Sequence, residues 1–194
     1  GVMSFLKEFP GIKLEIIYKT VDELLELLRE RKVDFILSYK PLCEAPDIDS
    51  MLLFENTLAL VVAKEHPLAV RNCIKLRELE GKTLLLPSKG LQARTMLDRL
   101  MDKEGVELHS SLELNETNIL LQMVATGHYA TILSTSAVFG KPRFKAIPLS
   151  EPGNIMEASL LRLKDAYQKT AAKEFIKILL ETDAVKRRLM NLFE

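Results

Sequence analysis

The sequence predicts an α/β fold built on mostly parallel sheets. Short apolar runs with strand character alternate with segments of helical periodicity along almost the whole chain. Some runs, such as Leu58–Ala63, are apolar at every position, which is typical of a strand covered on both faces. The 194 residues, 47% of them hydrophobic, suffice for one large domain or two small ones.

The first quarter of the chain predicts helix, strand, helix and strand in that order. Residues 12–18 alternate apolar and charged side chains, which is the pattern of a half-buried strand. Thr20 and Glu23 have the spacing of a capping box, so a helix should begin between them. The expected elements are a helix over 1–9, a strand over 12–18, a helix after Thr20 and a strand over 33–37 that ends at Ser38.

The remainder of the chain continues the same alternation. Two glycines, Gly105 and Gly127, end predicted helices, because glycine readily adopts the conformation that closes a helix. The expected strands cover residues 58–63, 83–86, 111–114, 130–134, 145–149 and 155–163. The expected helices cover residues 74–79, 91–104, 117–126, 171–180 and 184–193.

The charge balance argues against a chain that binds nucleic acid or a membrane surface by itself. The 27 Lys and Arg residues are matched by 27 Asp and Glu residues, so the formal net charge is zero. The longest apolar runs fall far short of the ~20 residues that cross a bilayer. The N-terminus has no basic stretch followed by an apolar one, and we therefore expect a cytoplasmic protein.

Cysteines and histidines give little support for catalysis or metal binding. Cys43 and Cys73 are the two cysteines, and we expect buried free thiols rather than a disulfide framework. The three histidines lie in separate segments without partners at metal-ligand spacing, so no metal and no cofactor are expected. The chain also lacks the glycine-rich phosphate loops and the nucleophile elbow of large enzyme classes. Cys43 is the alternative nucleophile, although no basic neighbour is placed to lower its pKa.

Polar residues recur where a predicted strand ends and a helix begins. Such points lie at the carboxyl ends of strands, where helix N-termini attract small anions. The alternative is that Thr20, Asn115 and Thr117 only cap their helices. Lys89 follows Ser88 just ahead of a helix, where a bound anion would offset the unfavourable cation. The candidate residues from this pattern are Thr20, Ser88, Lys89, Asn115 and Thr117.

Several strings in this order make the chain similar to the effector-binding domain of LysR-type transcriptional regulators. The matching strings are residues 9–14, 33–37, 58–63, 65–69 and 76–79, then Arg94, then Glu113 and Asn115 ahead of 121–127. The resemblance implies a type 2 periplasmic-binding-protein fold of two Rossmann-like subdomains joined by two crossover strands. Residues 1–64 with 151–194 would form the first subdomain, and residues 65–150 the second.

The resemblance also implies what the domain binds. A small, anionic effector would contact Thr20, Ser88, Lys89, Asn115 and Thr117 in a cleft between the subdomains, with Ser38 and Ser134 as further candidates. A homodimer or homotetramer is implied, in which the helix over 2–9 and the strand over 14–18 of one chain meet the helix over 94–103 of another. A winged helix-turn-helix that binds DNA, and the first strand of this domain, would precede Gly1.

Two other functions stay open at this stage. A solute-binding receptor of a transport system shares the fold and the cleft, but it requires an export signal. An enzyme that uses Cys43 or a histidine is the other alternative, and turnover of a cleft ligand would reveal it.

Overall fold

The computed structural model describes residues 2–41 and 45–180, which fall into two compact units. One unit contains residues 2–54 and 157–180, and the other contains residues 55–156. Each has its own sheet and its own apolar clusters. The predicted helix over 184–193 and Cys43 lie outside the described residues.

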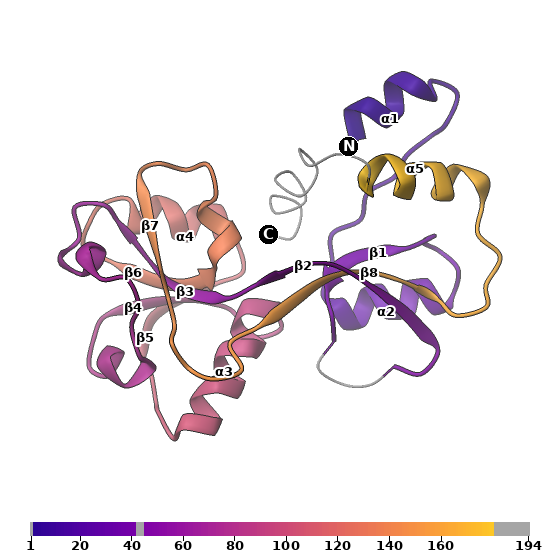
Figure 1. Cartoon of the computed structure of the whole chain (residues 1–194). Helices are drawn as coiled ribbons and strands as arrows, with labels where there is room; N and C mark the ends of the chain where they lie inside the picture. The colour runs from indigo at the N-terminus through magenta and orange to yellow at the C-terminus, as the bar shows by residue number, and fades with distance from the viewer. Residues whose placement is uncertain (1, 42–44, 181–194) are drawn as a thin grey trace. The chain divides into compact units, whose positions relative to one another are not determined.

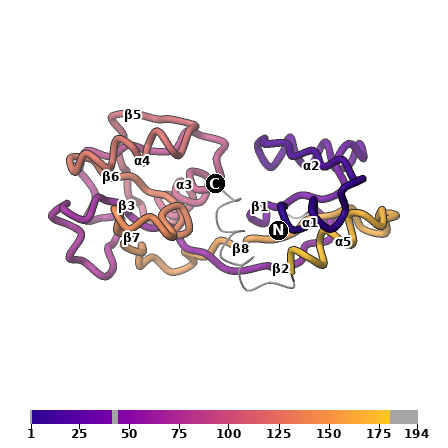
Figure 2. Tube along the Cα trace, turned by 90° about the horizontal axis from the view of Figure 1, so that it is seen from above, coloured from indigo at the N-terminus to yellow at the C-terminus, as the bar shows by residue number. Residues whose placement is uncertain are grey.

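The first unit is a three-stranded sheet between helices. Its elements are α1 (Val2–Glu8), α2 (Val21–Arg29), β1 (Ile36–Tyr39), β2 (Ile48–Asn56), β8 (Met156–Leu163) and α5 (Thr170–Leu180). The strand order is β1-β8-β2, and β1 runs antiparallel to β8 with Ile36 opposite Leu161. Figure 1 and Figure 2 both show β2 and β8 running side by side.

Opposite faces of this sheet pack against different helices. Figure 1 shows α5 on one side of the sheet and α2 on the other. The cluster beneath α2 consists of Val21, Leu25, Leu28, Ile36 and Leu161. The cluster beneath α1 and α5 is built on Phe5, Phe175 and Leu179, with Leu37 and Leu53 packed against it. Ile36 and Leu37 belong to different clusters because successive strand residues point to opposite faces.

The second unit is a five-stranded sheet with helices on both sides. Its elements are β3 (Leu58–Ala63), η1 (Pro67–Val70), η2 (Leu76–Leu79), β4 (Leu84–Pro87), α3 (Gln92–Glu104), β5 (Ser110–Leu114), α4 (Thr117–Val124), β6 (Ala130–Ser134), η3 (Thr135–Val138) and β7 (Phe144–Pro148). The strand order is β5-β4-β6-β3-β7, and Figure 1 shows α3 and α4 on opposite sides. One cluster packs Leu120, Leu121 and Val124 of α4 against the sheet.

The expectation of mostly parallel sheets holds for the second unit, where β3 alone among the described strands runs against the others, but not for the first, where β1 is antiparallel to β8. Among the described pairs, β4 is parallel to β5 and to β6, whereas β3 is antiparallel to β6 and to β7. Strand β3 is the first strand of this unit, and it runs in the opposite direction to β4, β5 and β6. Hydrophobicity alone does not report direction, because a buried strand is apolar in either ladder.

Three single elements differ from those expected. Residues 12–18 form neither strand nor helix, because no described strand pairs with them; Ile12 and Leu14 pack into the α1–α5 cluster instead. Conversely, β2 has no counterpart among the expected elements, because residues 48–56 do not alternate apolar and polar side chains. The expected start of β1 also moves from residue 33 to Ile36.

The helix ends follow the predicted local chemistry. Thr20 is the N-cap of α2, and its hydroxyl accepts from Glu23 N, while a Glu23 carboxylate oxygen accepts from Thr20 N at 3.0 Å. Gly105 closes α3 with φ +62°, in the left-handed region that glycine tolerates. The capping box and this glycine stop are therefore confirmed. Cys73, in contrast, is exposed, so the expectation of a buried thiol is wrong at this position.

Candidate functional site

The polar candidates of the second unit gather at one edge of its sheet. Because β4, β5 and β6 run in the same direction, their carboxyl ends share this edge. Strand β3 begins there, since Leu58 lies opposite Ser134. We call it the carboxyl edge, and it carries Ser88 and Lys89 after β4, Asn115 and Thr117 after β5, and Ser134 at the end of β6.

The segment after β4 is a tight turn held against β5. Ser88 N donates to Leu114 O at 2.8 Å, and Leu91 N donates to Ser88 O at 3.3 Å. Gly90 has φ +92°, as the third residue of a type II turn requires. Within the described parts of the chain, the Ser88 hydroxyl and the Lys89 ammonium make no hydrogen bond or ion pair. The turn therefore presents one hydroxyl and one cation to a ligand.

Helix α3 begins directly after this turn without a side-chain cap. Leu91 is its N-cap, which supplies no side-chain hydrogen bond, and the first turn holds no acidic residue. The first N–H groups of a helix lack partners inside the helix and carry partial positive charge. Together with Lys89, this terminus favours an anion.

The segment after β5 is capped by a residue that the sequence analysis did not single out. The Glu116 carboxylate accepts from Asn118 N at 3.1 Å and is the N-cap of α4. The expectation that Asn115 or Thr117 caps this helix is therefore wrong. In the described structure neither side chain makes a hydrogen bond, and both remain available at the carboxyl edge.

Arg94 links the end of β4 to the end of β5. Its Nη1 donates to Pro87 O at 3.1 Å and to Glu113 Oε1 at 2.7 Å, and its Nε donates to Asp98 at 2.7 Å. The side chain is only 9% exposed. The hydrogen bond from Arg94 is the largest cause of the lowered pKa of Glu113, to which the positive charge of Lys89 also contributes. Arg94 therefore fixes the ends of β4 and β5 relative to each other.

Ser134 belongs to a second cluster of polar side chains. The Ser134 and Ser136 hydroxyls lie 2.9 Å apart, and Asn56 Nδ2 donates to Ser136 Oγ at 2.6 Å. Asn56 Oδ1 accepts from Thr135 Oγ1 and from Thr57 N. Sequence reasoning identified Ser134 and missed Asn56, Thr135 and Ser136. The last two follow Ser134 directly, whereas Asn56 is distant in sequence and no local signal marks it.

Asn154 links the start of β3 to the segment that follows β7. Its amide nitrogen donates to Leu58 O and Leu149 O, and its oxygen accepts from Leu58 N, at 2.8 to 2.9 Å. Asn154 is 5% exposed, so these bonds replace water almost completely. The start of β3 is thereby tied to the chain segment that leads into β8.

The two remaining candidates lie in the first unit. Thr20 is engaged in its capping box, with its hydroxyl also donating to Glu23 at 2.8 Å. Ser38 is buried in β1 opposite Ser159. The structure thus shows the capping role of Thr20, and effector contact by Thr20 or Ser38 stays a prediction.

The described residues contain neither a cluster of metal ligands nor a membrane-spanning helix. Across residues 2–41 and 45–180, no three His, Cys, Asp or Glu side chains lie close enough to hold a metal ion. Nor does any described helix have the length and apolar character to span a bilayer.

The fold and the carboxyl edge together define a class of protein. A chain of two α/β units, with polar side chains where strands end and helices begin, has the architecture of type 2 periplasmic-binding-protein-like ligand-binding domains. Residues 2–184 match the family described as the LysR substrate binding domain. The chain belongs to this family.

Sequence relatives are transcriptional regulators. An uncharacterised HTH-type regulator of Bacillus subtilis, YybE, is 30% identical over 151 residues, covering 77% of this chain and 51% of the relative. The HTH-type regulator CbbR of Rhodospirillum rubrum is 25% identical over 134 residues, covering 69% and 44%. The chain spans about half the length of the curated relatives it matches.

Solved structures confirm the fold. The regulatory domain of Synechocystis PCC6803 CcmR, in complex with 2-PG, has a TM-score of 0.81 at 18% identity, covering 92% of this chain and 87% of that one. The effector binding domain of QuiR in complex with shikimate has a TM-score of 0.75 at 22% identity, covering 100% and 90%. The predicted family and fold class are therefore confirmed.

Proposed function

We propose that this chain is the sensing domain of a longer cytoplasmic transcriptional regulator and that it binds a small anionic metabolite. Binding of the metabolite at the carboxyl edge changes how a separate DNA-binding part acts. The chain itself contributes no catalytic step. A ligand shifts the equilibrium between two states of a protein only by its difference in affinity for those states.

The observation that carries this proposal is the set of free polar groups at the carboxyl edge. Ser88, Lys89, Asn115 and Thr117 come from two adjacent strand ends, and none of their side chains makes a hydrogen bond or ion pair among the described residues. The uncapped start of α3 adds N–H groups with positive partial charge. Structural relatives with 2-PG or shikimate support an effector of this size and charge.

Isothermal titration calorimetry on the 194-residue chain tests the site. The panel contains small carboxylates, phosphorylated short-chain acids and neutral isosteres. With an acid that binds, Ser88→Ala and Thr117→Ala should each weaken affinity about tenfold, because each removes a hydrogen bond to a charged group. Thr95→Ala is the matched control, since the described partner of Thr95 Oγ1 is Leu91 O at the start of its own helix. Wild-type affinity in both site variants would refute the assignment.

We also propose that the chain forms a homodimer or, by further assembly of dimers, a homotetramer. Four apolar side chains of the expected interface are exposed in the single chain, namely Met3, Leu6, Ile16 and Tyr18. Contact with α3 of a second chain would cover them. In analytical ultracentrifugation, Ile16→Glu should shift the chain toward monomer, while Val70→Glu, exposed in the other unit, should not. A monomeric wild-type chain would contradict this proposal.

The transport-receptor and enzyme alternatives receive no specific support. The curated relatives described above are transcriptional regulators. Cys43, the proposed nucleophile, lies outside the described residues.

A further inference from the structure

The two strand ends at the carboxyl edge offer different kinds of polar group. After β4 they are mainly hydrogen-bond donors, namely the Lys89 ammonium, the Ser88 hydroxyl and the first N–H groups of α3. After β5 they include strong acceptors, the Glu116 carboxylate and the Asn115 side-chain oxygen. The edge is therefore positive where β4 ends and negative where β5 ends.

Glu116 is held in place without being neutralised. Its Oε1 accepts from Asn118 N and from Asn118 Nδ2, both at 3.1 Å. Both donors are uncharged amides, and Glu116 forms no ion pair with any residue that the structure describes. Its Oε2 accepts no hydrogen bond from those residues either, and the side chain is exposed. The end of β5 thus presents one carboxylate oxygen to a positively charged ligand group.

Lys89 and Glu116 stand at matching positions but do not pair with each other. Pro87 of β4 lies opposite Leu114 of β5, and Lys89 and Glu116 each follow two positions later. Adjacent strands are about 4.8 Å apart. In the described parts of the chain the two side chains nevertheless form no ion pair. Two opposite charges at neighbouring strand ends are therefore left for a ligand to bind.

The charges behind these two residues are already paired. Arg94 donates to Glu113 Oε1 and to Asp98, in each case at 2.7 Å. Arg94 is also the largest cause of the lowered pKa of Glu113, and Lys89 adds a smaller contribution through its charge. Of the charged residues at the ends of β4 and β5, Lys89 and Glu116 are thus the two that a ligand can pair.

We infer that the effector carries a protonated amine in addition to its acidic group, as an amino acid does. This inference rests on the proposed function, because the acidic group binds at Lys89 and the start of α3 as described above. The amine, with its several N–H donors, binds the oxygens of Glu116, Asn115 and Thr117. A second acidic group at that position would face Glu116 and be repelled, so the like charge selects against diacids.

NMR titration with acids that differ only by an amine tests this inference. The probe pairs are alanine and propanoate, aspartate and succinate, and phosphoethanolamine and ethyl phosphate, added to the isotope-labelled 194-residue chain at low salt. The Gly90 amide, in the turn before α3, reports binding. The amine-bearing probe of each pair should bind about three- to fivefold more tightly, as one exposed ion pair allows. It alone should shift the side-chain amide of Asn118, which donates to Glu116.

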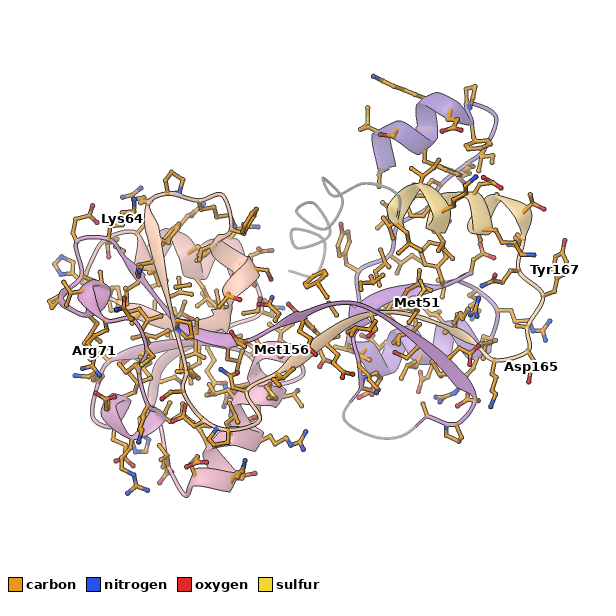
Figure 3. The ribbon with its side chains drawn as sticks, in the orientation of Figure 1. Met51, Lys64, Arg71, Met156, Asp165 and Tyr167 are labelled. Carbon is orange, nitrogen blue, oxygen red and sulfur yellow. The ribbon has the colours of Figure 1, made fainter. Side chains whose placement is uncertain are left out.

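Glu116→Gln is the variant that isolates the charge, because a glutamine oxygen retains an acceptor for Asn118. It should abolish the preference for the amine-bearing probes. Lys89→Gln should weaken both members of each pair and leave their ratio unchanged. The controls are Glu107→Gln, ahead of β5, and Lys64→Gln, after β3, both exposed at the opposite edge of the sheet. Lys64 is labelled in Figure 3, and both controls should bind every probe as wild type does.

The outcomes separate this inference from the proposed function. Acids that bind without preference for the amine, or a preference that survives Glu116→Gln, overturn the inference and leave the proposed effector site standing. A Gly90 signal that no probe moves overturns both the site and the inference.

Discussion

The two units differ in how far apart in sequence their key polar contacts are. In the first unit, Thr20 and Glu23 are three positions apart, exposed, and bonded through the local helix start. In the second unit, Asn154 bonds to Leu58 across 96 positions and Asn56 to Ser136 across 80, and all of these groups are buried. Local contacts position Thr20 in the first unit, and long-range contacts hold the polar groups beside β3 in the second.

This difference has energetic consequences. Removal of an exposed N-cap side chain loses a hydrogen bond that water can replace, so the free energy of unfolding falls only a little. A buried amide that bonds to the backbone leaves donors and acceptors without water when it is removed. The carboxyl edge should therefore depend on distant residues more strongly than the start of α2 depends on its own cap.

Asn154→Ala should have the largest effect. Three backbone groups at Leu58 and Leu149 lose their hydrogen bonds to the Asn154 amide, and we expect about 3 kcal/mol of destabilisation. Urea unfolding followed by circular dichroism measures it. Asn118→Ala, an exposed amide bonded to Glu116, is the control and should stay within about 0.5 kcal/mol. Equal effects in the two variants would remove the distinction between buried long-range contacts and exposed local ones.

Arg94→Met should have the next largest effect. The aliphatic stem is retained, but Pro87 O and Glu113 lose their cation, so we expect about 2 kcal/mol of destabilisation. The pKa of Glu113 should rise back toward its ordinary value, which carbon-detected NMR titration reports. Arg99→Met, exposed on the same helix, should change neither quantity. An unchanged Glu113 pKa would show that Arg94 does not organise this edge.

Thr20→Ala should cost about 1 kcal/mol through the lost cap of α2. Thr117→Ala is the matched control, because Thr117 follows the cap of α4 and should cost less than about 0.5 kcal/mol. Chemical denaturation of both variants gives the comparison. If Thr117→Ala were the more destabilising of the two, the local character of the first unit's contact would be in doubt.

The smallest expected effect is a loss of stability at acidic pH. Hydrogen bonds from Lys19 and Thr20 lower the pKa of Glu23 to about 2, below the roughly 4.3 of a free glutamate. Because the folded pKa is the lower one, this stabilisation is full above the unfolded pKa and is lost as pH falls through about 2. The stability gap between wild type and Glu23→Gln should narrow between pH 5 and pH 2. A gap independent of pH would show that Glu23 titrates normally.

The sequence predicted most elements of the second unit, because each has a local signal. Apolar runs marked β3, β4 and β6, and the glycine stop marked the end of α3. The prediction from sequence failed where an element depends on pairing with a neighbouring strand. Residues 12–18 have the alternation of a strand but no described strand pairs with them, and β2 pairs with β8 without an alternating pattern.

The sequence by itself determined the family, the α/β class and the residues that follow each strand, because these depend on patterns within a few positions. Only the tertiary structure decided strand direction, the capping of α4 by Glu116 and the arrangement of Arg94, Asn56 and Asn154 behind the carboxyl edge. The physical reason is that a hydrogen bond across 80 or 96 positions leaves no periodic trace in the chain. It forms only when folding excludes water from both partners.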